Sequence, residues 1–135
     1  MGLLTLIIIA LVVYGIAYSV YGSYLERVAD IDEKRETPAH SMNDGVDYVP
    51  ATAPVLLGHH FASIAGGGPI VGPIAAVVFG WLPCFIWIVL GCVFIGGVHD
   101  FFGLIGSARH KGLSVGEIIG QHVGKKARTW FLVFV

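Results

Sequence analysis

The feature that most constrains this chain is a long stretch without charge. Residues 48–99 contain no Asp, Glu, Lys or Arg, and neither do residues 1–25. Charged side chains make up only 13% of the chain, against about 25% in a typical soluble domain. Such a chain has too little polar surface to cover a globule in water. We therefore expect an all-helical integral membrane protein.

The hydropathy pattern and the helix-breaking residues divide the chain into six segments. We predict a first transmembrane helix in 1–25, a polar connector in 26–54, a broken transmembrane helix in 55–82, a transmembrane helix in 83–106, a cytoplasmic loop with a surface helix in 107–128, and the start of a truncated transmembrane helix in 129–135. A complete span needs about 20 apolar residues. We therefore expect the chain to be a piece of a longer protein.

Two of these segments carry finer signals. The dense charges of residues 26–36 predict that the first helix continues beyond the membrane, up to Thr37 and Pro38. In the later loop, Ser114 and Glu117 have the spacing of a capping box. They predict a short amphipathic helix over 114–124 that lies on the membrane surface.

The sequence Ala-Gly-Gly-Gly-Pro-Ile-Val-Gly-Pro occupies residues 65–73. In a helix interior each glycine costs about 1 kcal/mol relative to alanine, and proline costs about 3 kcal/mol. This predicts two half-helices with an unwound joint over 65–69, the second beginning near Ile70. Beyond the joint, Gly72, Ala76 and Gly80 repeat at every fourth position, which predicts a face for tight helix packing.

A broken helix persists in a bilayer only where it is buried in protein or lines a cavity. The positive end of the second half-helix would suit a carboxylate, and the last carbonyls of the first would suit a cation. The candidate substrate or ion site therefore comprises Ser63, Ala65, Gly66, Gly67, Gly68 and Pro69. The alternatives are a packing kink and a channel filter.

Four ionisable residues are candidates for proton coupling: His59, His60, His99 and Asp100. Histidine titrates near neutrality, and an acidic residue at membrane depth is a functional hypothesis by default. The alternatives are a haem ligated by His59 and His99, and an ordinary helix-end contact between Asp100 and Arg109.

Other functional classes lack support in the sequence. Cys84 and Cys92 do not have the spacing of a metal site. No nucleophile elbow, phosphate-binding loop or zinc-protease motif is present. Basic residues interleaved with aromatic ones, as in nucleic-acid binding, are missing as well. We predict no enzymatic activity, no metal, no cofactor and no nucleic-acid partner.

The orientation depends on whether 55–82 crosses the membrane or re-enters. If it crosses, all eight Lys and Arg side chains lie on one face, which is the cytoplasmic face by the positive-inside rule. If it re-enters, the connector and the later loop lie on opposite faces. The charge distribution favours crossing.

Two sequence blocks carry a family resemblance. They are Asn-Asp-Gly-Val-Asp-Tyr-Val-Pro at 43–50 and Val-Leu-Leu-Gly-His-His-Phe-Ala-Ser-Ile-Ala-Gly-Gly-Gly-Pro-Ile-Val-Gly-Pro at 55–73. With His99–Phe101, Arg109 and Ser114–Glu117, they closely resemble the carbon starvation protein A family. Members often have glutamine in place of His99 and alanine in place of Gly67.

The resemblance implies a function and a fold. It implies the amino-terminal part of a leucine-transporter-like fold with a broken core helix, in a multi-pass carrier of the cell inner membrane. This carrier would take up peptides or pyruvate under carbon starvation, coupled to protons or another cation. Its partners would be the lipid bilayer, a small anionic nutrient or peptide, and the remaining spans. The alternative is a small histidine-ligated redox or structural membrane subunit.

Overall fold

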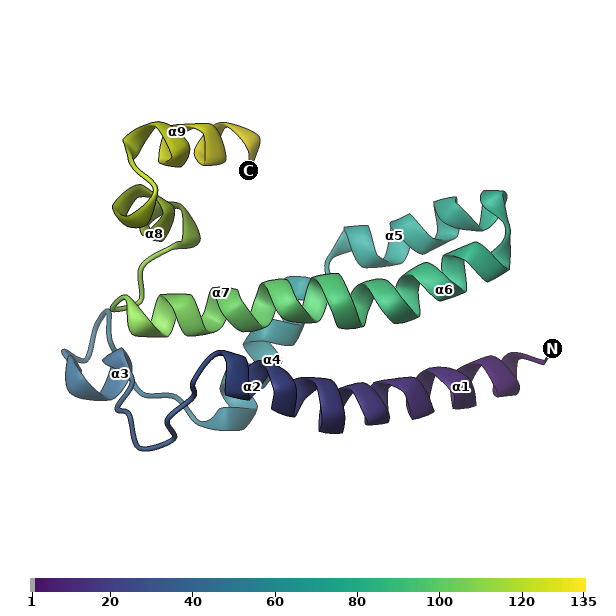
Figure 1. Cartoon of the computed structure of the whole chain (residues 1–135), viewed down its shortest axis with the longest axis horizontal. Coiled ribbons are helices and arrows are strands. Elements are labelled where there is room, and N and C mark those ends of the chain that lie inside the picture. Colours follow the sequence, from purple (N-terminus) through teal and green to yellow (C-terminus); the bar gives the residue numbers. More distant parts are fainter. Residues whose placement is uncertain (1) are drawn as a thin grey trace. The chain divides into compact units, whose positions relative to one another are not determined.

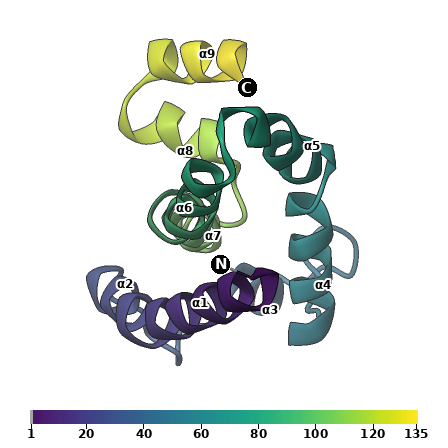
Figure 2. The same cartoon turned by 90° about the vertical axis from the view of Figure 1, so that its right-hand side faces the viewer.

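The computed structural model describes residues 2–135, and every regular element among them is helical. This confirms the predicted all-α class. The chain forms two compact units, shown along two directions in Figures 1 and 2. The first unit comprises Met1–Val28 and Ala51–Val98, and the second comprises Ala29–Pro50 and His99–Val135.

The first unit begins with a continuous helix over Leu3–Val28 that is long and apolar enough to cross a membrane. It consists of α1 (Leu3–Ile16), a π-helical turn (Ala17–Gly22) and α2 (Ser23–Val28). The predicted continuation through residue 36 is wrong. The helix ends at Val28, and Asp30 adopts a left-handed conformation with φ 50° that a right-handed helix cannot contain.

The predicted break is present, but it is shorter than expected. Helix α4 (Ala53–Ile64) and helix α5 (Gly67–Ala76) with its 3₁₀ turn (Val77–Phe79) are bent by 45° at a joint of two residues. The prediction that the second half-helix begins near Ile70 is wrong. Pro69 is the third residue of α5, where a backbone amide has no intrahelical acceptor, so the missing N–H costs no hydrogen bond.

The third long helix runs over Trp81–Arg109 and is also apolar enough to cross a membrane. It consists of α6 (Trp81–Gly91), a π-helical turn (Cys92–Gly96) and α7 (Gly97–Arg109). It starts two residues before the predicted start at 83, because Pro83 also sits at the third position of its helix. Together with the bent pair, the described residues contain two or up to three candidate spans.

Helices α5 and α6 form a tight antiparallel hairpin, visible at the right of Figure 1. The 3₁₀ turn Val77–Phe79 and one further residue, Gly80 with φ 110° and ψ 142°, connect them. A side chain at this position would force a backbone conformation that L-residues rarely adopt. The hairpin therefore depends on glycine at position 80.

The second unit contains α3 (Pro38–Ser41), α8 (Val115–His122) and α9 (Lys125–Phe134). The predicted capping box is confirmed: Ser114 Oγ accepts the Glu117 amide, and the Glu117 carboxylate accepts the Ser114 amide at 3.2 Å. The structure begins the last helix at Lys125, four residues before the predicted position 129. The basic residues after α8 therefore open α9.

The segment 43–50 forms a compact turn around one carboxylate. Asp44 Oδ1 accepts the backbone amides of Tyr48, Val46 and Asp47, each at 2.9 Å. These hydrogen bonds favour the ionised carboxylate and lower the pKa of Asp44 from its ordinary value, with the bond from Tyr48 contributing most. The turn thereby fixes the position of the Tyr48 side chain.

Two side chains attach the connector to the carboxyl end of α7. The Tyr48 hydroxyl donates to the Lys111 carbonyl at 2.8 Å. The Arg109 guanidinium donates to the carbonyls of Ala29 and Asp30, the latter at 2.7 Å. Asp30 and Lys111 both have positive φ, at 50° and 57°. Each of these left-handed residues, just beyond a helix end, thus has its carbonyl bound by a distant side chain.

The geometry of Gly80 predicts the effect of a minimal substitution. Gly80→Ala should destabilise the protein by about 1–3 kcal/mol, because alanine at φ 110° is strained. The added methyl group would make only an ordinary contact with Pro83, at 3.6 Å. Gly58→Ala, in the interior of α4 with open space around its Cβ, is the matched control. Thermal unfolding should show a lower Tm for Gly80→Ala only. Equal Tm values for the two variants would contradict this account of the hairpin.

Candidate substrate and ion site at the broken helix

The joint between α4 and α5 has ordinary backbone angles. Ala65 has φ −75° and Gly66 has φ −73°, so neither residue is in the left-handed region. A Cβ built on Gly66, Gly67 or Gly68 would meet nothing within 4 Å. Within the described residues, neither backbone strain nor packing explains why three consecutive glycines are found here. Because glycine has no side chain, these three residues leave the backbone amides and carbonyls at the joint uncovered.

The uncovered backbone groups have opposite polarity on the two sides of the joint. The amides of Gly67 and Gly68 belong to the first turn of α5, where helical N–H groups have no intrahelical acceptor. The last carbonyls of α4 on the other side lack intrahelical donors. Each helix end carries about half an elementary charge, positive for α5 and negative for α4. The joint therefore has amide donors on one side and carbonyl acceptors on the other.

The structure places the other predicted residues of this unit on α4. The Ser63 hydroxyl donates to the His59 carbonyl at 2.9 Å, so its proton is used within the helix and its oxygen is left as an acceptor. His59 and His60 are exposed neighbours, and neighbouring side chains on a helix diverge by about 100°. At most one of the two can therefore face the same side as the joint.

His99 and Asp100 form a separate pair on α7, in the second unit. His99 Nδ1 lies 3.1 Å from Asp100 Oδ1. The imidazole is 79% exposed, whereas the carboxylate is 35% exposed. Two titratable groups at hydrogen-bond distance can share or exchange a proton.

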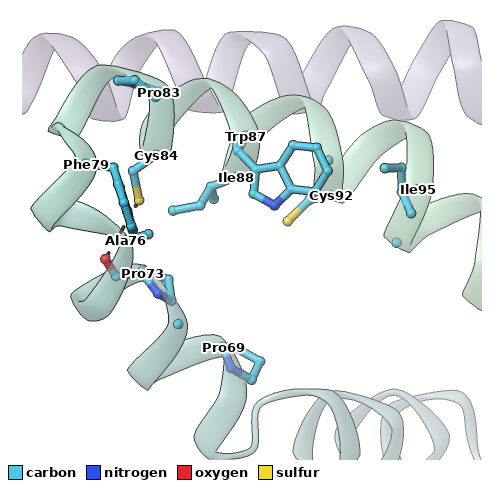
Figure 3. A pocket seen from close by; sticks show the side chains of 13 residues that line it. Pro69, Pro73, Ala76, Phe79, Pro83, Cys84, Trp87, Ile88, Cys92 and Ile95 are labelled. Atoms are coloured by element: carbon cyan, nitrogen blue, oxygen red, sulfur yellow. Dashed lines mark hydrogen bonds between the residues drawn. The ribbon is translucent and has the colours of Figure 1, made fainter.

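Sequence analysis missed an apolar cavity of about 760 Å³ between α5 and α6 (Figure 3). Figure 3 shows Pro69 and Pro73 on one wall and Trp87, Ile88 and Cys92 on the other. Gly72 and Ala76 also line it, and a Cβ on Gly72 would meet nothing within 4 Å. Within the described residues no side chain packs against Gly72, and the predicted packing face stays a prediction. The spacing of Gly72 and Ala76 in the sequence nevertheless indicates the α5 wall of the cavity.

One cysteine has a specific contact in the cavity. Cys84 Sγ lies 3.8 Å from the Pro73 carbonyl, the distance of a weak S–H hydrogen bond across the hairpin. Residues 2–135 contain no group of three or more His, Cys, Asp or Glu side chains that could hold a metal ion.

Comparisons with known proteins show the family of the chain. Residues 2–135 match the family described as carbon starvation protein CstA. The chain is 50% identical over 121 residues to the peptide transporter CstA of Campylobacter jejuni, which covers 89% of this chain and 17% of that protein. It is 45% identical over 131 residues to the peptide transporter CstA of Escherichia coli, covering 96% and 19%.

A third relative carries a different name. The chain is 44% identical over 122 residues to the pyruvate/proton symporter BtsT of Escherichia coli, with 90% of this chain and 17% of that protein covered. The chain thus spans less than a fifth of the length of these three relatives. No solved structure matches it.

Proposed function

The chain belongs to the carbon starvation protein CstA family, and we propose that it forms part of a secondary transporter for peptides or pyruvate, driven by protons or another cation. Two relatives are named peptide transporters and a third a pyruvate/proton symporter, which supports this class of function. The apolar helices support a membrane location, for which we propose a multi-pass arrangement in the inner membrane. The relatives' names do not favour a histidine-ligated redox subunit.

The observation that carries the proposal is the uncovered backbone at the joint. Pyruvate and peptides share one group, a carboxylate. The amides of Gly67 and Gly68, at the positive end of α5, would bind this carboxylate. The last carbonyls of α4 would coordinate the coupling cation. A side chain at Gly66, Gly67 or Gly68 would cover these groups, whereas glycine lets a ligand approach the backbone closely.

The proposed coupling uses the titratable groups near the spans. His59 or His60 on α4 would carry a proton close to the joint, and the His99–Asp100 pair would carry one on α7. The apolar cavity between α5 and α6 would be covered by further spans of the same carrier, as expected of a broken core helix in a leucine-transporter-like fold.

Contacts inside the second unit support the proposed topology. The first long helix ends at Val28 and the third ends at Arg109. The Arg109 side chain binds the carbonyls of Ala29 and Asp30, which supports an arrangement in which both carboxyl ends would emerge at one membrane face. In that arrangement the bent pair, which connects the two helices in sequence, would cross. All eight Lys and Arg side chains fall on that same face, which the positive-inside rule makes cytoplasmic.

Single-cysteine labelling tests this topology. In a protein with Cys84 and Cys92 replaced by serine, His40→Cys reports on the connector and Val78→Cys on the tip of the α5–α6 hairpin, where Val78 is 86% exposed. In intact cells, a membrane-impermeant maleimide should label Val78→Cys. It should label His40→Cys only after the cells are permeabilised. A re-entrant pair would place both cysteines on one face, so the same labelling pattern at both positions would refute crossing.

Uptake by the complete carrier tests the proposed function. Gly67→Leu adds a side chain in open space, at a residue inside α5, so the fold should be retained. The leucine would cover the first-turn amides of α5, and initial uptake rates of labelled pyruvate and a labelled dipeptide should fall at least tenfold. Gly58→Leu, equally open but in the interior of α4, is the control. Uptake at the wild-type rate by Gly67→Leu, at equal membrane abundance, would favour a purely structural break.

A further inference from the structure

Two histidines that the sequence analysis left without a role meet in the second unit. His110 follows the last residue of α7, and His122 is the last residue of α8. Their Nε2 atoms are 2.8 Å apart, and the two rings meet edge to face at 88° with centroids 5.0 Å apart. The two histidines are twelve positions apart in sequence, and a loop and α8 begin between them. This spacing does not correspond to a known sequence motif.

The backbone around His110 fixes the direction of its ring. His110 Nδ1 lies 2.7 Å from the Gly106 carbonyl, which can only accept a proton. This partner assigns the proton to Nδ1 and leaves a lone pair on Nε2, toward His122. The helix end is itself fixed, because Lys111 has φ 57° and the Gly112 amide donates to the Ser107 carbonyl at 2.8 Å. Imidazoles that bind metals in proteins typically donate their second nitrogen to a carbonyl in this way.

His122 completes a pair of nitrogen donors. In the metal-free state its Nε2 has to carry the proton of the hydrogen bond, because His110 Nε2 has none. His122 is exposed, so this proton can move through solvent to Nδ1 and leave the ring neutral. Two imidazole nitrogens at right angles on a metal, each at about 2.0–2.1 Å, would be about 2.9 Å apart. The observed separation of 2.8 Å is close to that value.

The electrostatic setting also favours a cation. Helices α7 and α8 both end at this pair, and the carboxyl end of each helix carries about half a negative charge. Of the two basic residues that flank His110 in sequence, Arg109 directs its guanidinium to the carbonyls of Ala29 and Asp30. Lys111 beside His110, and Lys125 and Lys126 at the start of α9 after His122, are positive charges that oppose cation binding.

We propose that His110 and His122 form a binding site for a divalent late transition-metal ion, with water completing the coordination. Imidazole nitrogen suits copper, zinc and nickel, and of these copper(II) is bound most tightly by a given nitrogen site. The ion would take the place of the Nε2–Nε2 hydrogen bond and connect the end of α7 to the end of α8. The proton of that hydrogen bond would move through solvent to His122 Nδ1, so the pair gains and loses no proton in total. Binding weakens on acidification, because only neutral imidazole ligates.

Electron paramagnetic resonance with Cu²⁺ tests the site. The purified protein in lipid nanodiscs receives one equivalent of Cu²⁺ at pH 7.5. The expected spectrum is axial, with superhyperfine splitting from two imidazole nitrogens. His110→Gln and His122→Gln should each remove one nitrogen from the spectrum and raise the Kd at least tenfold. His40→Gln is the matched control. His40 is also exposed, and its ring makes a hydrogen bond with Thr37 and not with a second histidine.

The number of coordinated nitrogens in the wild-type spectrum tests the proposal even if a variant folds poorly. Fewer than two coordinated nitrogens in the wild-type protein would overturn the proposal. So would an equal loss of affinity in His40→Gln, because copper would then be bound by scattered histidines. Zn²⁺ should displace Cu²⁺ from the wild-type protein when added in excess. Failure of Zn²⁺ to do so at any concentration would overturn the assignment to this class of ions.

Discussion

The backbone of a helix in lipid has no water to bind, and this constraint decides how the joint between α4 and α5 can exist. Breaking a helix exposes amides on one side and carbonyls on the other, and each exposed group costs several kcal/mol if it stays unpaired in hydrocarbon. The joint is reduced to Ala65 and Gly66, which keeps the number of freed groups small. Pro69 lowers the number of freed amides further, because proline has no N–H and occupies a first-turn position where a helical amide would have no acceptor. The groups that remain free are those that an ion or a carboxylate can bind.

The connector residues hold the second unit together through contacts that are distant in sequence. Arg109 and Tyr48 bind carbonyls at or near two helix ends that lie about eighty positions apart in sequence. Arginine and tyrosine are suited to this, since each offers donors at the end of a side chain that reaches across several ångströms. The Asp44 turn orients Tyr48, and it depends on an ionised carboxylate. In the proposed topology, these contacts would place the ends of the first and third long helices at one membrane face.

The sequence predicted those parts of the fold that depend on local properties. Charge-free runs mark the helices because hydropathy is local, and the capping box at Ser114 is a local pattern as well. Helix starts were placed two or three residues late at Pro69 and Pro83, because proline was treated as a helix boundary when it is tolerated throughout the first turn. The end of the first helix was missed because its partner, Arg109, lies far along the chain. The cavity and the His110–His122 pair bring together residues of different segments; the spacing of Gly72 and Ala76 indicates one wall of the cavity, but no periodicity indicates the opposite wall or the histidine pair.

The central claim is that the amino end of α5 recognises a carboxylate. It is tested most directly by calorimetric binding to the complete carrier of pyruvate and of pyruvamide, its uncharged amide of nearly equal size. A helix amino terminus stabilises an anion and offers little to a neutral amide. The account predicts that pyruvamide binds at least tenfold more weakly than pyruvate, which corresponds to about 1.4 kcal/mol. Equal affinity for the two ligands would contradict it.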